Sequence, residues 1–155
     1  VGTLDRDAAE GNLGSFKTQG HRRILGILDC GDPVPGAGAW GINQAQGAND
    51  AYASTTLAMS GCHICLFTTG RGNPIGNACM TTIKITGNPQ TATALEDMID
   101  YSAAPMLYGE LSLQESGREL YELLLRVANG EETKAEKLGD YSWTTPHGTS
   151  YNGDN

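Results

Sequence analysis

The glycine-rich stretch 67–77 (FTTGRGNPIGN) holds the residues best suited to binding a small anion. Its glycines let the backbone turn sharply and present N–H groups to a ligand, and its threonines and asparagines add neutral polar side chains. Arg71 is the one cation of the stretch, and its planar guanidinium suits a carboxylate or phosphate held by two hydrogen bonds. We predict a substrate-binding loop whose contacting residues are Thr68, Thr69, Gly70, Arg71, Gly72 and Asn73.

The position of this stretch supports that prediction. It follows an apolar run of strand length, and ligands of open α/β sheets bind beyond the carboxyl ends of the strands. It lacks the Gly-Lys-Ser/Thr of a Walker loop and does not open a helix as G-x-G-x-x-G, so nucleotide binding is only weakly indicated. The alternative is a structural loop in which Arg71 ties down the end of a neighbouring helix.

Cys62 and Cys65 have the C-x-x-C spacing found in zinc and redox sites. A structural zinc ion needs four ligands, and the remaining thiols, Cys30 and Cys79, do not form a second such pair. A redox pair usually stands at a helix N-terminus, whereas this pair follows a predicted helix and enters a strand. We therefore predict that Cys62 and Cys65 pack as small hydrophobic residues and that the thiols are reduced. A thiol redox protein that uses this pair is the alternative.

No other spacing is typical of a catalytic or metal site. No G-x-S-x-G elbow or other Ser/His/Asp arrangement is present, so the catalytic residues stay unassigned. The possible oxygen ligands do not follow the spacing of a calcium loop, and we predict no complete metal site among them. These residues are Asp5, Asp7, Glu10, Asn49, Asp50, Asp97 and Asp100.

Alternating strand-like and helix-like segments must position the loop. Strands are predicted at 23–29, around 40–42, at 63–68 and at 80–86, the third buried on both faces and the last alternating. The first helix is predicted from the N-cap Asn49 to Ser60, with Gly61 as its stop, and the second begins at Asn88-Pro89. The second helix is expected to bury Leu95, Met98 and Ile99.

A third helix is predicted at 112–129. Ser112 and Glu115 have the spacing of a capping box, and Gly130 is expected to end the helix. Its buried stripe is predicted to consist of Leu113, Leu120, Leu124 and Val127.

This order of elements predicts an α/β fold: a three-layer α/β/α arrangement with a mostly parallel sheet and helices on both faces, Rossmann-like in class. We expect an irregular lead-in from a missing upstream region at 1–22, the α/β domain at 23–139, and a polar C-terminal tail at 140–155. The first residue is Val1 rather than Met, which favours a fragment, a processed product or an excised domain.

Composition excludes several classes of protein. The 155 residues suffice for one domain, and 18% charged with 39% hydrophobic residues fit neither a disordered chain nor a coiled coil. A net charge of −8 disfavours nucleic acid and anionic membranes as partners. Without a long apolar run or a basic leader, we expect a cytoplasmic protein.

Several motifs together resemble the C-terminal domain of the altronate/galactarate dehydratase family. The similar segments run in order from about residue 12 to residue 138 and include Asp100 with Ala103 and Ala104. The most characteristic are SGCHICLFTTGRGNPIGN at 60–77 and IKITGNP at 83–89; LGSFKT at 13–18, VANG at 127–130 and TKAE at 133–136 also match.

The resemblance implies a hydro-lyase that removes water from a sugar acid to give a 2-keto-3-deoxy acid and depends on Fe²⁺ or Mn²⁺. The family also includes the large subunit of sulfolactate sulfo-lyase, which eliminates sulfite. In that setting Arg71 is expected to clamp a substrate carboxylate while Thr68, Thr69 and Asn73 meet hydroxyls. Elimination beside a carboxylate also requires charge stabilisation by a metal or an arginine.

The sequence departs from the family in two respects. Residues 9–12 (AEGN) stand where the family usually has Glu-Glu-Lys-Ser, so no role of that lysine transfers. The family's enzyme is also much longer, and its upstream domains are expected to hold most of the metal ligands. We predict that the isolated domain has little or no activity, that upstream domains are its partners, and that a homo-oligomer is possible. A stand-alone module that binds a small anion without catalysis is the alternative.

Overall fold

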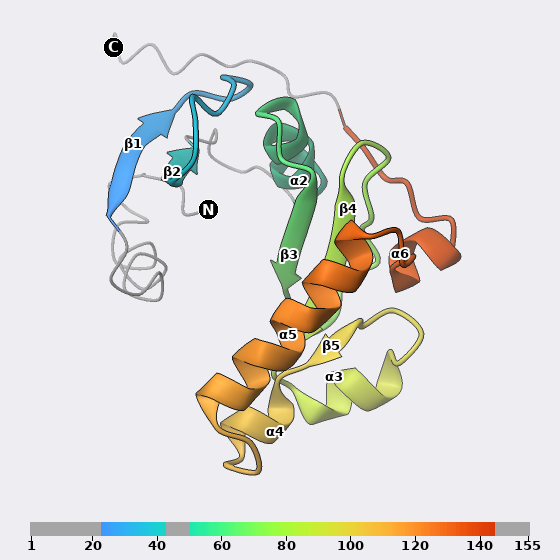
Figure 1. Cartoon of the computed structure of the whole chain (residues 1–155). Helices are drawn as coiled ribbons and strands as arrows, with labels where there is room; N and C mark the ends of the chain where they lie inside the picture. Colours follow the sequence, from blue (N-terminus) through green and yellow to red (C-terminus); the bar gives the residue numbers. More distant parts are fainter. Residues whose placement is uncertain (1–22, 43–49, 145–155) are drawn as a thin grey trace, which may run out of the picture. The chain divides into compact units, whose positions relative to one another are not determined.

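A computed structural model describes residues 23–42 and 50–144 of the chain. The elements, labelled as in Figure 1, are β1 (Ile24–Leu28), β2 (Ala39–Ile42), α2 (Asp50–Met59), β3 (Ile64–Thr68), β4 (Thr81–Thr86), α3 (Pro89–Ala94), β5 (Tyr101–Ser102), α4 (Ala104–Leu107), α5 (Leu113–Ala128) and α6 (Lys134–Lys137). Every strand pairing in this part is parallel, and the predicted α/β class is confirmed. The described strands form two sheets, β1-β2 and β3-β4-β5.

The chain divides into two compact units, Val1–Cys62 with Thr144–Asn155, and His63–Trp143. The boundaries predicted at residues 22 and 139 stay a prediction. In the first unit, β1 pairs with β2 through Ile24↔Ala39 and Leu28↔Ile42. Helix α2 buries Ser54 and Thr56 and is followed by Gly61 at φ +91°, the left-handed stop that was predicted. The predicted cap Asn49 lies outside the described residues.

Strand β4 is the centre of the second unit's sheet, between β3 and β5. It is buried from Thr82 to Thr86, whereas β3 has one neighbour and leaves Leu66 46% exposed. The prediction that 63–68 is buried on both faces is therefore wrong for the part of the chain described here. Strand β3 stands at the edge of the described sheet, and its side chains are covered less than those of the central strand β4.

Helix α5 packs on the sheet through Leu120, Leu123 and Leu124 and builds the apolar core with Ile83, Ile85 and Val127. The predicted capping box of Ser112 and Glu115 is present, and Gly130 follows the helix at φ +99°. Leu113, predicted in the buried stripe, is 69% exposed. It stands in the first turn, two turns before the leucines that reach the core.

Helix α3 begins as predicted, with Asn88 as N-cap and Pro89 in the first turn. It ends at Ala94 and not beyond Ile99, because the C-cap Leu95, with φ −124° and ψ 38°, leaves the helical conformation. Ile99 is nonetheless buried, at 4% exposure. The short elements β5, α4 and α6 have two to four residues and were not predicted. None of the described helices is long and apolar enough to cross a membrane.

Candidate functional site

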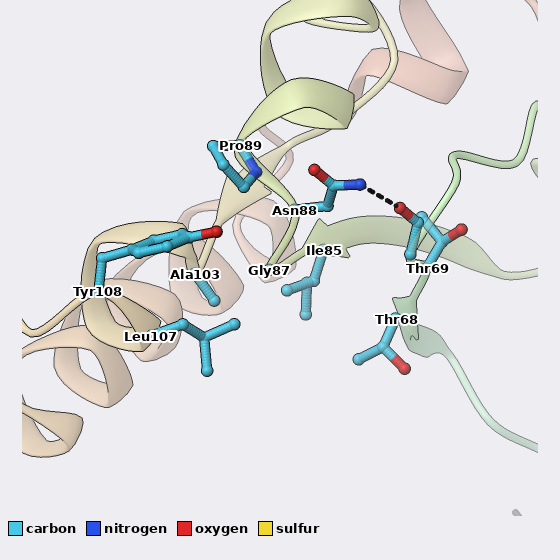
Figure 2. A pocket seen from close by; sticks show the side chains of 10 residues that line it. Thr68, Thr69, Ile85, Gly87, Asn88, Pro89, Ala103, Leu107 and Tyr108 are labelled. Atoms are coloured by element: carbon cyan, nitrogen blue, oxygen red, sulfur yellow. Dashed lines mark hydrogen bonds between the residues drawn. The ribbon is translucent and has the colours of Figure 1, made fainter.

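An open hollow of about 600 Å³ lies at the carboxyl ends of β3, β4 and β5. The segments that follow the three strands surround it, and Figure 2 shows side chains from all three of them facing the same space. This is the edge of a parallel sheet at which ligands of α/β proteins usually bind. The lining residues are Thr68, Thr69, Gly70, Ile85, Gly87, Asn88, Pro89, Ala103, Leu107 and Tyr108.

The turn after β3 forms the polar side of the hollow. Thr69 is fixed to the sheet because its N–H donates to the Ile85 carbonyl at 2.8 Å. Within the described part of the chain, no hydrogen bond engages the hydroxyl of Thr68 or of Thr69. Both hydroxyls are thus available to a polar ligand at the strand end.

The carbonyl of Gly70 is held from two sides. It accepts hydrogen bonds from Asn88 Nδ2 at 3.2 Å and from Thr91 Oγ1 at 2.9 Å. Figure 2 shows the first of these bonds crossing from the turn after β4 to the turn after β3. Asn88 Oδ1 also accepts from the Gln90 N–H at 3.0 Å, so one side chain caps α3 and fixes the loop.

Packing does not explain the glycine at position 70. Its φ is not in the left-handed region, and a Cβ there would meet nothing within 4 Å. Gly72 differs, because its φ is +87° and a Cβ would overlap the Leu95 side chain. Gly72 is therefore required by the fold, whereas Gly70 leaves open backbone facing the hollow, as expected where a ligand approaches the main chain.

The structure brings only part of the predicted loop into the hollow. Thr68, Thr69 and Gly70 line it, and Arg71, Gly72 and Asn73 do not. Arg71 is exposed and forms no ion pair with any described residue. Asn73 Oδ1 accepts from the Ile75 N–H at 2.8 Å and so shapes the next turn. A substrate-binding role for these residues stays a prediction.

The opposite side of the hollow is not predicted by the sequence patterns. The pattern around Asn88 predicts a helix cap, although its position after a strand is also a signal for a site residue. Leu107 and Tyr108 come from α4 and its C-cap, an element too short to show periodicity. They are 63% and 68% exposed and form an apolar rim together with Pro89.

The hollow is equipped for binding rather than for acid–base chemistry. Its lining contains no carboxylate, imidazole, thiol or ammonium group, and the phenol of Tyr108 is its one ionisable side chain. Within residues 23–42 and 50–144, no three His, Cys, Asp or Glu side chains gather as metal ligands. The Fe²⁺ or Mn²⁺ that the resemblance implies, expected to be held mainly by upstream domains, stays a prediction.

The sheet carries a buried charge at Lys84. Its side chain is fully buried, and Nζ lies 3.8 Å from Asp140 Oδ2 without a hydrogen-bond partner among residues 23–42 and 50–144. Burial lowers the pKa of Lys84, while the charges of Asp140 and Asp100 oppose that shift. The Asp100 carboxylate accepts from the backbone N–H of Lys84 at 2.7 Å and from that of Lys134 at 2.8 Å, so this side chain joins β4 to α6.

All four cysteines lie in the described part of the chain, and none of them forms a disulfide there, but they differ in exposure. Cys65 is buried, as predicted, whereas Cys62 is half-buried and Cys30 and Cys79 are exposed. The packing interpretation of the C-x-x-C pair thus holds fully for Cys65 and in part for Cys62.

Comparisons with known proteins give a consistent set of relatives. The model of a family described as D-galactarate/altronate dehydratase, C-terminal, matches residues 6–148. The (2R)-sulfolactate sulfo-lyase subunit beta of Chromohalobacter salexigens is 40% identical over 128 residues, which cover 82% of this chain and 32% of that protein. The altronate dehydratase of Escherichia coli is 32% identical over 126 residues, covering 81% of this chain and 25% of the relative.

A third relative, the galactarate dehydratase (L-threo-forming) of Escherichia coli, is 31% identical over 125 residues, 81% of this chain and 24% of that enzyme. The chain spans 24% to 32% of the length of these three curated relatives.

Proposed function

This chain belongs to the D-galactarate/altronate dehydratase C-terminal family, and on that premise we propose that it is the substrate-binding part of a longer lyase. The lyase removes water from a sugar acid of the altronate or galactarate type and gives a 2-keto-3-deoxy acid. The hollow at the strand ends is the observation that carries the proposal: it combines available threonine hydroxyls with open glycine backbone.

The chemistry of the substrate fits the polar side of this hollow. A sugar acid carries one or two carboxylates and several hydroxyls, which pair with the hydroxyls of Thr68 and Thr69 and with the backbone at Gly70. Arg71 follows Gly70 directly, is exposed, and has no ion-pair partner among the described residues, which supports its assignment to a substrate carboxylate.

The reaction needs more than binding. Dehydration breaks a C–H bond beside the carboxylate and a C–O bond at the next carbon, and negative charge develops on the carboxylate as the proton leaves. An arginine held on that carboxylate stabilises this charge. The proton acceptor must come from residues that do not line the hollow, because the lining offers no base apart from a phenol. The roles assigned to this chain therefore rest on hydrogen bonding and charge.

A second candidate is a sulfo-lyase subunit that acts on (2R)-sulfolactate. It is favoured by the higher identity to the sulfo-lyase subunit, 40% against 32% and 31% for the two dehydratases. The same hollow and Arg71 then bind the carboxylate beside the carbon that loses a proton, and sulfite leaves from the next carbon. The two candidates share the binding step and differ in the leaving group.

Assays of the longer enzyme separate the candidates and test the hollow. Altronate, galactarate and (2R)-sulfolactate are offered in turn, and 2-keto acid and sulfite are measured. We expect 2-keto acid to form from a sugar acid. Turnover of sulfolactate alone, with release of sulfite, would favour the second candidate. Turnover of none of these acids would contradict both.

The matched variants are Gly70→Ala and Gly36→Ala, since at both positions a Cβ would meet nothing within 4 Å and φ is not left-handed. Gly70→Ala places a methyl group in the hollow and is expected to lower kcat/KM about tenfold, equivalent to about 1.4 kcal/mol. Gly36→Ala is expected to leave kcat/KM unchanged, and both variants should keep the wild-type Tm. An unaltered kcat/KM in Gly70→Ala would remove the hollow from the substrate site.

A further inference from the structure

We propose that the apolar rim of the hollow, formed by Pro89, Leu107 and Tyr108, is the docking surface for the remainder of the longer enzyme. The inference rests on the proposed function and adds to it the place at which the two parts meet. The occupant is a segment of the same enzyme outside this chain that presents apolar side chains to the rim and brings a proton acceptor to the hollow.

The first support is the character of the rim. Leu107 and Tyr108 are 63% and 68% exposed, and the wall below them consists of Ile85 and Ala103. Figure 2 shows Leu107 and Tyr108 across the hollow from Thr68 and Thr69. A sugar acid satisfies the threonine side, but its hydroxyls and carboxylates gain nothing from the leucine side. Adjacent exposed apolar residues beside a binding site are typical of a protein contact.

The second support is the incomplete chemistry of the hollow. A ligand bound at Thr68–Gly70 has no carboxylate, imidazole or ammonium group of this chain's lining within reach. Proton abstraction requires a base within hydrogen-bond distance of the substrate. Another segment must therefore face the polar side of the hollow, and the side of the hollow opposite Thr68 and Thr69 is formed by α4.

The third support concerns the occupant. The chain covers 32%, 25% and 24% of three relatives, so in each of them the remaining part is longer than the part that matches. The rim residues carry no charge, although the whole chain has a net charge of −8. Contact through apolar side chains is thus favoured over attraction between opposite charges, and two copies of this acidic chain would repel one another.

The experiment measures whether the rim is covered. Tyr108→Cys and, as a matched control, Leu138→Cys are prepared in the 155-residue chain and in the longer enzyme; Leu138 is 56% exposed and does not line the hollow. Labelling by a maleimide is followed by peptide mass spectrometry, which separates the new thiols from the exposed Cys30 and Cys79. We expect Tyr108→Cys to react at least tenfold more slowly in the longer enzyme, and Leu138→Cys to react at similar rates in both proteins.

Equal rates for Tyr108→Cys in the two proteins would overturn the proposal. Slow labelling already in the 155-residue chain would overturn it too, because a second copy or another segment of this chain would then be the occupant. Equal slowing at Leu138→Cys would show protection that is not specific to the rim, with the same consequence. None of these labelling results depends on the substrate. If the longer enzyme converted neither altronate, galactarate nor (2R)-sulfolactate, the proposed function would be contradicted, and the labelling rates would still decide whether the rim is a docking surface.

Discussion

The Asn88 side chain links the loop at the hollow to the start of α3. Its amide nitrogen donates to the Gly70 carbonyl at 3.2 Å, and its amide oxygen accepts from the Gln90 N–H at 3.0 Å. The two bonds can be separated by substitution. Asn88→Asp keeps an oxygen acceptor for the cap but loses the donor to Gly70, whereas Asn88→Ala loses both.

We expect Asn88→Asp to keep the free energy of unfolding within about 0.5 kcal/mol of wild type, since Asp and Asn are equivalent N-caps. Asn88→Ala should lose about 1 kcal/mol. Both variants free the Gly70 carbonyl on one side and should raise KM in the longer enzyme. Denaturant unfolding and steady-state kinetics measure the two effects; a wild-type KM in Asn88→Asp would show that the bond to Gly70 does not position the substrate loop.

Lys84 is a fully buried charge whose nearest counterion, Asp140, is 3.8 Å away. Replacement of such a lysine by an apolar residue of similar length removes a desolvation cost, so Lys84→Met is expected to be neutral or stabilising at pH 7. Asp140→Asn leaves the ammonium without its nearest counterion and should destabilise the fold by about 2 kcal/mol. Denaturant unfolding of the two variants checks both signs, and destabilisation by Lys84→Met would contradict the argument.

The pH dependence of stability follows from the same burial, which lowers the pKa of Lys84 below its ordinary 10.5. Between the lowered pKa and 10.5 the unfolded chain binds a proton that the folded chain has released. The stability of the wild type should therefore rise with pH in that window relative to Lys84→Met. Unfolding curves of both proteins at pH 7, 9 and 10 give the difference, and a constant difference would mean that Lys84 titrates as it does in water.

At the scale of elements, sequence patterns predicted those whose signals are local. The capping box of Ser112 and Glu115, the N-cap Asn88 and the stop at Gly61 depend on a few neighbouring residues, and all are present. Exposure of the strands depends on their order in the sheet, which no local pattern encodes. HICLFT at 63–68 looks like a buried strand but contains an edge strand, and the alternating 80–86 contains the central one.

The contrast between local signals and strand order also explains which residues of the site were predictable. Thr68, Thr69 and Gly70 were predicted from one contiguous stretch that follows a strand. Leu107 and Tyr108 join them only because β5 lies parallel to β4 and places the turn after Ser102 at the same sheet edge. Since β5 has two residues, its position leaves almost no trace in the sequence.

Helix α6 offers an element-scale test, because Glu136 joins it to the sheet. Its carboxylate accepts from Thr81 Oγ1 at 3.0 Å and from the Thr133 N–H at 2.8 Å. Burial opposes ionisation, but the hydrogen bonds from Thr133 and Thr81 outweigh it and hold the pKa of Glu136 below its ordinary value. The stability gained from this ionised group is complete above pH 4.5 and is lost as the pH falls through the lowered pKa.

We therefore expect Glu136→Gln to be less stable than wild type at pH 7, by roughly 0.5–1 kcal/mol because the site is partly exposed to solvent. The difference should shrink below pH 4. Thr81→Val removes the bond to the sheet without removing the cap within α6, and should show about half of the effect. Thermal unfolding at pH 7, 5 and 3.5 measures these differences. A stability difference between wild type and Glu136→Gln that grows in acid would contradict the predicted sign of the pH dependence.

At the scale of the whole molecule, the proposed function separates the binding groups from the reactive groups. The described chain supplies a sheet edge, two available threonine hydroxyls and open glycine backbone, and its hollow lacks a base. The matched part makes up 32%, 25% and 24% of the three relatives. In those proteins this domain is therefore accompanied by a larger amount of additional polypeptide. Such a division agrees with the apolar rim beside the hollow, at which we propose that a further segment of the enzyme docks.

The 155-residue chain alone is consequently expected to bind a sugar acid weakly and to convert none of it. Binding is measured by chemical-shift changes of the Thr69 and Gly70 amides on addition of galactarate, altronate or (2R)-sulfolactate, with glycerol as an uncharged control. Turnover is measured as 2-keto acid or sulfite, with Fe²⁺ or Mn²⁺ added. Shifts with the acids but not with glycerol, and no product, are the expected results, because the hollow meets carboxylate and hydroxyl groups but offers no proton acceptor. Product formed by the chain alone would mean that a base or metal ligand lies within these 155 residues. It would contradict the proposal that this chain binds the substrate while another part of the enzyme supplies the proton acceptor.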